Sequence, residues 1–150
     1  MKTFNLIPFI IGILLCVSCK DTEEHPEIQY VKTVFGGCNN IANFQKSNDV
    51  EENQVVITTT VDTICVFVGL NYICGAPFKT QCNIEDDHIR MWITDTCENG
   101  MDCYQRCDCY YTFDFLFKRK GDINYRYTVE LISPREGQSK ILSEGHIGPL

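Results

Sequence analysis

Four cysteines lie close together in the sequence, and thiols in such a cluster can bind a metal, exchange disulfides or form structural disulfides. They follow the pattern Cys97-x5-Cys103-x3-Cys107-x-Cys109. Zinc sites usually take their ligands in closely spaced pairs, and no C-x2-C pair is present here. The same spacing is typical of reactive redox dithiols, so redox exchange is also disfavoured. We therefore expect these cysteines to form structural disulfides.

The total number of cysteines supports the same expectation. Ten are present, and Cys16 and Cys19 lie in an N-terminal segment considered below. An even number in an exported domain favours disulfides, at most four here. We expect Cys74 and Cys82, which flank a short loop around Pro77, to form a local bridge. The eight disulfide candidates are Cys38, Cys65, Cys74, Cys82, Cys97, Cys103, Cys107 and Cys109.

Two acidic groups offer oxygen ligands that a hard cation such as calcium prefers. The first is Glu85-Asp86-Asp87, and the second comprises Asp95, Glu98, Asn99 and Asp102. If the two groups are close in space, they form a calcium site. Neither group has the spacing of an EF-hand loop. We expect solvated turn residues instead, and we expect no metal or other cofactor.

Catalytic motifs are missing from the sequence. It contains no G-x-S-x-G, no H-E-x-x-H and no glycine-rich phosphate loop. His88 follows Asp87, but neighbouring residues on a strand point to opposite faces and cannot cooperate as an acid–base pair. The formal net charge of −7 argues against a nucleic-acid partner. We therefore expect a protein that is not an enzyme.

The elements that position these residues have the two-residue period of β-strands. We expect strands at 28–35, ended by Gly36-Gly37, at 55–60 and 61–70 with a bend at Asp62-Thr63, at 89–94, and at 141–142. Two further segments, 111–117 and 125–131, are predicted to form an antiparallel hairpin with an aromatic face. The fold expected is all-β, a single antiparallel β-sandwich of immunoglobulin-like type stapled by disulfides.

Aromatic residues alternate in the segment that follows the cysteine cluster. Tyr111, Phe113, Phe115 and Phe117 share one face, and we expect them in the core. Cys109 has the same parity, so it should also point into the core and link it to another element. Better candidates for a solvent-exposed glycan or peptide platform lie off this pattern, namely Trp92, Tyr104 and Tyr110.

The N-terminus has the composition of a secretion signal. Lys2 is followed by an apolar run to Val17 and by the small residue Ser18. The run of about fourteen residues is short for a membrane span, which needs roughly twenty. We predict a signal peptide at 1–18, a tether at 19–27 and a disulfide-rich β-domain at 28–150.

The segment Leu14-Leu15-Cys16-Val17-Ser18-Cys19 resembles a bacterial lipoprotein signal with a lipobox that ends at Cys19. The following Lys20-Asp21-Thr22-Glu23-Glu24 resembles the surface-export signal of Bacteroidetes lipoproteins. This resemblance implies acylation of Cys19 and a lipid anchor in the bacterial outer membrane, with the domain at the cell surface or in the periplasm. Acyl chains hold a protein stably when two or more are attached.

Two further segments carry weaker resemblances of the same kind. Asp62-Thr63-Ile64 resembles the O-glycosylation site of exported Bacteroidetes proteins, which would make Thr63 the acceptor. The segment from Cys107 to Phe115 is similar to the core hairpin of an uncharacterised lipoprotein family.

The function expected from these features is a noncatalytic binding or interaction module of the cell envelope. Its partner would be a protein, a peptide or a glycan, bound through loops at one end of the sandwich. Two other classes stay open. A rigid loop such as Cys97–Cys109 suits a protease-inhibitor-like module, and a metal-dependent envelope enzyme would require tightly bound calcium or zinc.

Overall fold

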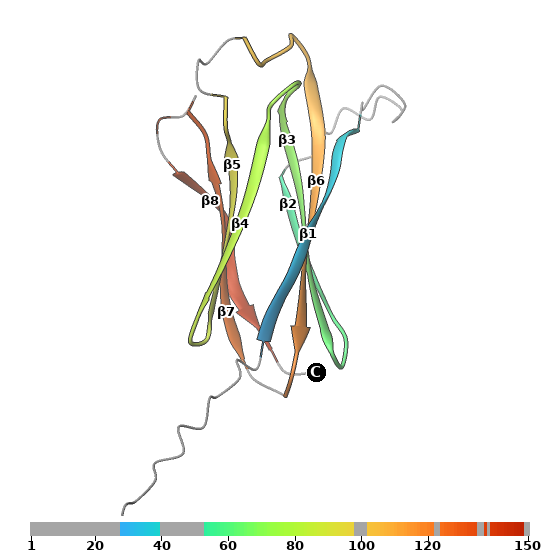
Figure 1. Cartoon of the computed structure of the whole chain (residues 1–150), viewed down its shortest axis with the longest axis vertical. Coiled ribbons are helices and arrows are strands. Elements are labelled where there is room, and N and C mark those ends of the chain that lie inside the picture. Colours follow the sequence, from blue (N-terminus) through green and yellow to red (C-terminus); the bar gives the residue numbers. More distant parts are fainter. Residues whose placement is uncertain are drawn as a thin grey trace, which may run out of the picture.

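The computed structural model describes residues 28–39, 53–97, 102–121, 124–134, 137 and 139–148. These residues form two β-sheets packed face to face (Figure 1). The strands are β1 (Ile28–Asn39), β2 (Gln54–Thr59), β3 (Thr63–Ile73), β4 (Phe78–Glu85), β5 (His88–Asp95), β6 (Asp108–Arg119), β7 (Tyr125–Ile132) and β8 (Ser139–Ile147). The expected all-β sandwich is confirmed.

The two sheets contain four strands each. Sheet A has the order β1-β6-β3-β2, and sheet B has the order β4-β5-β7-β8. Neighbouring strands pair antiparallel except at one point, because β5 and β7 are parallel. An immunoglobulin-like arrangement is not confirmed, since that fold places its first, second, fifth and fourth strands together in one sheet.

The core lies between the sheets and is made by alternate residues of each strand. The predicted aromatic face of β6 is confirmed, because Phe113, Phe115 and Phe117 are fully buried and Tyr111 is nearly so. Sheet B supplies the opposing layer through residues such as Ile89, Met91 and Ile93, which are also fully buried. The alternating apolar residues were therefore a correct guide to the buried face of both sheets.

The predicted hairpin of residues 111–117 and 125–131 is wrong. β6 pairs with β1 and β3 in sheet A, whereas β7 pairs with β5 and β8 in sheet B. Both strands point their apolar residues inward, so they meet across the core instead of along a shared edge. Alternation identifies the buried face of a strand, but it does not identify the sheet to which the strand belongs.

The edge strand β1 of sheet A does not end at Gly36-Gly37, where the sequence predicted its end. β1 continues to Asn39 through a bulge between Phe35 and Gly37. Gly37 has a φ of 75°, which a glycine adopts without strain. A Cβ on Gly36 would meet the side chain of Thr112 on β6. The two glycines thus allow the strand to bend and stay paired, and the predicted strand end is wrong.

Three disulfides join six of the eight candidate cysteines. The bonds are Cys38–Cys109, Cys74–Cys107 and Cys97–Cys103. Cys109 is fully buried and links β6 to β1, as its parity predicted. The expected Cys74–Cys82 bridge is wrong, because Cys74 pairs with Cys107, its cross-strand neighbour beyond the end of β3.

Cys65 and Cys82 are not disulfide-bonded, so the maximum of four bonds is not reached. Cys65 alternates with the buried Ile64 and Val66, and therefore lies on the solvent side of sheet A. Cys82 lies on the edge strand β4 and packs against the core between the sheets. The two thiols are thus on opposite sides of a sheet and cannot meet.

The predicted signal peptide, the tether and Cys19 lie outside the described residues. In the described part of the chain, no helix is long and apolar enough to cross a membrane.

Candidate functional site

The β4–β5 hairpin positions a polar group on the solvent side of sheet B. Its two-residue turn consists of Asp86 and Asp87, and Asp86 adopts a φ of 52°. Asp tolerates this left-handed conformation better than most residues, which is why acidic residues suit the turn. Because β5 pairs in parallel with β7, His88 lies opposite Arg126 at the start of both strands.

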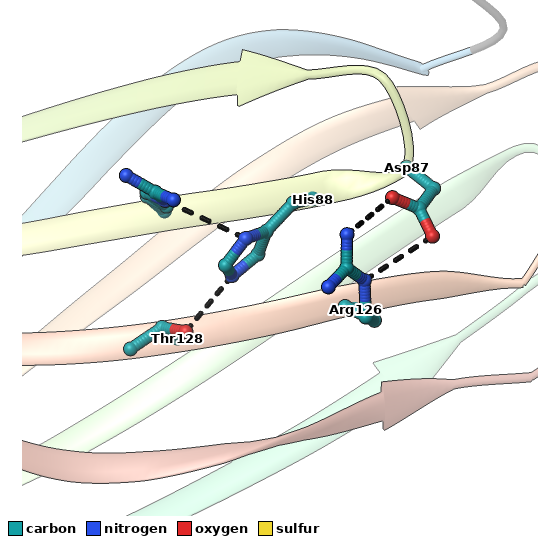
Figure 2. A network of polar contacts seen from close by, with 5 residues as sticks. Asp87, His88, Arg126 and Thr128 are labelled. Carbon is teal, nitrogen blue, oxygen red and sulfur yellow. Dashed lines mark hydrogen bonds and ion pairs between the residues drawn. The ribbon is translucent and has the colours of Figure 1, made fainter.

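Asp87 and Arg126 form a bidentate ion pair (Figure 2). The Arg126 Nη2 atom is 2.8 Å from Asp87 Oδ1, and Nε is 3.2 Å from Oδ2. The Arg126 backbone N–H also donates to the Asp87 carbonyl at 2.7 Å. The guanidinium lowers the pKa of Asp87 below its usual range. About half of each side chain is exposed, so the pair orients Arg126 more than it stabilises the fold.

His88 is held by hydrogen bonds at both ring nitrogens. Arg90 Nε donates to His88 Nδ1 at 3.4 Å, so Nδ1 acts as an acceptor. The proton of the neutral ring then lies on Nε2, which is 2.9 Å from Thr128 Oγ1 (Figure 2). Asp87 is oriented toward Arg126 and not toward His88. The group is therefore a set of hydrogen-bonding side chains and not an acid–base pair.

Trp92 lies on β5 four residues after His88 and two after Arg90, on the same solvent-facing side. It is partly exposed, and it alternates with the fully buried Met91 and Ile93. In register across the sheet, its neighbours are Gln81 on β4 and Glu130 on β7. Ile141 on β8 lies opposite Glu130 and is 54% exposed. We call this surface, from Gln81 across Trp92 and Glu130 with the adjoining His88, Arg90 and Thr128, the outer face of sheet B.

The outer face of sheet B combines an aromatic ring with donors and acceptors on both sides. Directly paired residues on adjacent strands have Cβ atoms about 5 Å apart, so these side chains form one continuous surface. An indole ring can pack against the apolar side of a ligand, while amide, carboxyl and guanidinium groups bind its polar edge. Of the three aromatic surface candidates, Trp92 is the one on this face.

The other two aromatic candidates occupy different positions. Tyr104 packs against the core, and its hydroxyl donates to Asp95 Oδ2 at 2.6 Å. Tyr110 lies on the solvent side of sheet A over Gly69, where a Cβ would meet its ring. Tyr104 is therefore a structural residue, and Tyr110 belongs to the opposite surface of the sandwich.

The predicted calcium ligands are not brought together. Asp86 and Asp87 precede β5, whereas Asp95 ends it, at the opposite end of the strand in Figure 1. Eight residues of strand separate them by roughly 26 Å. Glu85 accepts a hydrogen bond from Asn83, Asp102 is exposed, and Glu98 and Asn99 lie outside the described residues. The acidic residues of the two groups that the structure describes are therefore far apart, and they do not meet the condition set for a shared calcium site.

Asp95 instead forms a buried polar network that sequence analysis missed. It is 4% exposed, and it accepts hydrogen bonds from the hydroxyls of Tyr72 and Tyr104 and from the Cys97 backbone N–H. Tyr72 also shares a hydrogen bond with the buried Ser133. Burial, followed by the contact with Asp95, raises the pKa of Tyr104 beyond its usual range. The sequence did indicate the burial of Asp95, because this residue continues the inward-facing alternation of Ile89, Met91 and Ile93 along β5.

Thr63 is the first residue of β3, directly after the connection from β2. It is partly exposed, and its hydroxyl donates to Asp62 Oδ1 at 3.2 Å. The connection is closed by a hydrogen bond from the Thr60 N–H to the Thr63 carbonyl. O-glycosylation at Thr63 remains a prediction.

Comparisons with known proteins give no relative for this chain. It matches no protein-family model, no curated protein and no solved structure. The arrangement of its side chains is therefore the basis for a functional proposal.

Proposed function

We propose that this protein is a noncatalytic binding module of the bacterial cell envelope, anchored to the outer membrane by a lipid on Cys19. Its ligand lies on the outer face of sheet B, across Trp92. The observation that carries the proposal is the position of Trp92, which is partly exposed and flanked in register by Gln81 and Glu130. A flat sheet surface with one ring and many hydrogen-bonding groups suits a ligand that is itself flat and polar.

A glycan fits this surface better than a protein or a peptide. Sugar rings present C–H groups on one side, which pack against an aromatic ring, and hydroxyls at the edge, which both donate and accept. The face offers donors on Arg90, acceptors on Glu130 and both on Gln81 and Thr128. The loops at one end of the sandwich have less support as a binding surface, because the loop closed by Cys97–Cys103 contains residues outside the described part of the chain.

The alternatives have no comparable support. An inhibitor-like function depends on the loop Cys97–Cys109, which contains residues outside the described part of the chain. A metal-dependent enzyme requires converging ligands, and the carboxyl groups described here point to separate partners. An immunoglobulin-like ancestry is not needed for the proposed function, because the layered arrangement alone supplies the flat face.

Fluorescence of the single tryptophan gives a direct test. The chain contains one Trp, so quenching or a spectral shift on adding a ligand reports on position 92 alone. We expect binding to at least one soluble polysaccharide of a panel, and a Trp92→Ala variant should lose it when binding is measured by affinity electrophoresis. Phe67→Ala removes a partly exposed ring from the solvent side of sheet A and serves as the matched control.

Two results would contradict the glycan proposal. One is the absence of a shift or of retardation with every polysaccharide. The other is an equal loss in the Phe67 variant. The anchor has its own test, the intact mass of the mature protein extracted from its membrane. An acyl addition on Cys19 is expected, and a mature chain that starts at Cys19 without lipid would refute anchoring while leaving the binding face untouched.

A further inference from the structure

Two of the three disulfides lie in contact distance of each other. The Sγ atoms of Cys38, Cys74 and Cys109 are all within 4.8 Å of one another. Cys38 is bonded to Cys109, and Cys74 is bonded to Cys107. Four cysteines from three chain segments therefore form one sulfur cluster, at the end of the sandwich where β3 ends and β6 begins (Figure 1).

The local structure explains why the two bonds are adjacent. Cys107 lies directly before β6, and Cys109 is the second residue of the strand, so the two cysteines adjoin at the start of β6. Cys74 lies opposite Cys107, where its backbone N–H donates to the Cys107 carbonyl at 2.9 Å. Cys38 reaches Cys109 from β1, the neighbour of β6 on the other side. One half of each bond thus comes from the start of β6, Cys109 from the strand itself and Cys107 from the residue before it.

Each bond has one exposed and one buried residue. Cys107 and Cys38 are exposed, whereas Cys74 is 3% exposed and Cys109 is fully buried. An external thiol would approach each bond from the side of its exposed residue, and the sulfur of the buried residue is then the leaving group. For the Cys74–Cys107 bond, that leaving sulfur lies beside the second disulfide.

We propose that these two bonds form a disulfide relay, which exchanges with an external dithiol at Cys107 and passes the exchange on to Cys38–Cys109. A thiolate of the dithiol attacks Cys107 Sγ, a mixed disulfide forms, and Cys74 leaves as a thiolate. The Cys74 thiolate attacks Cys38 Sγ, which forms a Cys38–Cys74 bond and releases Cys109 as a thiolate.

The second thiol of the reagent completes the sequence. It attacks the mixed disulfide, so the reagent leaves as its own disulfide and Cys107 is released. One dithiol is oxidised and one protein disulfide is reduced, and the two protons of the dithiol are taken up by Cys107 and Cys109. The intramolecular step is fast because the attacking and attacked sulfurs are already neighbours.

The other cysteines in the described part of the chain are outside this cluster. Cys97 and Cys103 are not among the neighbouring sulfur atoms, and neither are the unbonded Cys65 and Cys82. The Cys97–Cys103 bond can therefore serve as an internal control in the same molecule.

The intramolecular step between Cys74 and the Cys38–Cys109 bond can be observed alone by substituting Cys107 in a chain without the unbonded thiols Cys65 and Cys82. A Cys107→Ser variant, made in a Cys65→Ser, Cys82→Ser chain, leaves Cys74 as a thiol beside Cys38–Cys109. After acid quenching and alkylation, peptide mass spectrometry should find the free thiol distributed over Cys74, Cys38 and Cys109. The matched control, Cys103→Ser in the same chain, leaves the buried Cys97 as a thiol, and there the free thiol should remain at Cys97. A free thiol found only at Cys74 would overturn the proposal.

A second measurement covers the case in which Cys107→Ser does not fold. Reduction of the chain by limiting dithiothreitol is followed bond by bond. In a Cys74→Ser, Cys107→Ser variant, Cys38–Cys109 should be reduced about tenfold more slowly, because the intramolecular route is gone. A Cys97→Ser, Cys103→Ser variant should leave that rate unchanged. Equal rates of Cys38–Cys109 reduction in all three chains would exclude the relay.

Discussion

Asp95 lies in an environment that is unusual for an acidic residue. Its carboxyl group is buried and accepts three hydrogen bonds, from two phenols and one backbone N–H. We expect Asp95→Ala to lower the free energy of unfolding by about 3 kcal/mol, since it leaves buried donors without an acceptor. Urea denaturation followed by circular dichroism measures this change.

An exposed acid provides the control for Asp95. Asp108 begins β6 and is exposed, so Asp108→Ala should change the unfolding free energy by less than about 0.5 kcal/mol. Asp95→Asn keeps one acceptor oxygen and should be less harmful than Asp95→Ala. If the alanine and asparagine variants are as stable as the unchanged chain, the network does not contribute to folding.

Cys82 offers a prediction on pH and reactivity. Burial raises the pKa of its thiol from 9.0 to about 12. The folded state therefore favours the neutral thiol, a contribution that is complete below pH 9 and is lost as the pH rises toward 12. Because the thiolate is the nucleophile, alkylation by iodoacetamide at pH 8 should be up to about 1000-fold slower in the folded chain than in urea.

Peptide mass spectrometry of chains alkylated for increasing times gives the rate at each cysteine. Cys65, whose pKa is also raised by burial and by Asp114, serves as the comparison on the solvent side of sheet A. Labelling of folded Cys82 at the rate seen in urea would show that its thiol is not protected.

At the scale of the elements, the connection between β3 and β4 depends on one glycine. Gly75 has a φ of 81°, and a Cβ there would meet the carbonyl of Cys103. We expect Gly75→Ala to destabilise the fold by about 3 kcal/mol, because backbone strain and a backbone clash combine. Thermal unfolding of the purified variant measures the loss.

A comparison with Gly37 separates the effect of backbone strain from the effect of the clash. Its φ of 75° is similar, but a Cβ would meet nothing within 4 Å. Gly37→Ala should therefore show only the conformational strain, about 1 kcal/mol. Equal losses in the two variants would mean that the contact with the Cys97–Cys103 loop has no influence on stability.

The elements also show where sequence patterns are informative. The alternation of Phe113, Phe115 and Phe117 predicted the buried face of β6, because the two-residue period is a local property of a strand. It did not predict that β7 pairs with β5, since sheet membership depends on contacts distant in sequence. The same limit applied to the outer face of sheet B, where Trp92 was recognised but its neighbours Gln81 and Glu130 depend on pairing.

Polar contacts between neighbouring strands could not be predicted from the sequence either. The interaction of His88 with Thr128 requires the parallel register of β5 and β7, which no local signal specifies. Asp95 was different, because an acid at an inward position of an otherwise apolar alternation is visible in the sequence. A search for polar residues on the predicted core face would have found it.

At the scale of the whole molecule, the disulfides gather at one end of the sandwich and the β4–β5 turn lies at the other (Figure 1). The sequence set an upper limit of four bonds, and the described residues contain three. Parity resolves the difference, since Cys65 faces solvent while its neighbours Ile64 and Val66 enter the core. Two of the bonds, Cys38–Cys109 and Cys74–Cys107, therefore join strands or strand ends of sheet A, whereas the packed core holds the two sheets together.

The length of chain that each bond encloses predicts how much it stabilises the molecule. Cys38–Cys109 spans 71 residues of sequence, whereas Cys97–Cys103 spans 6. In the chain-entropy model, the longer loop contributes about 4 kcal/mol and the shorter about 2 kcal/mol. Replacing both cysteines of a bond by serine avoids a leftover thiol that could exchange. We expect the Cys38→Ser, Cys109→Ser chain to unfold at a clearly lower urea concentration than the Cys97→Ser, Cys103→Ser chain.

This order distinguishes two ways in which the bonds can act. If the bonds act by restricting the unfolded chain, the stabilisation from each bond depends on its loop length, and the bond from β1 to β6 contributes the most. If they act mainly by holding the folded loop beside Asp95, removing Cys97–Cys103 is the more damaging change, because Cys97 donates its backbone N–H to that carboxyl group. Equilibrium unfolding of both variants, with the Asp95→Ala chain alongside, decides between them. A larger loss for Cys97–Cys103 that matches the loss for Asp95→Ala would place the main role of the disulfides in the folded state.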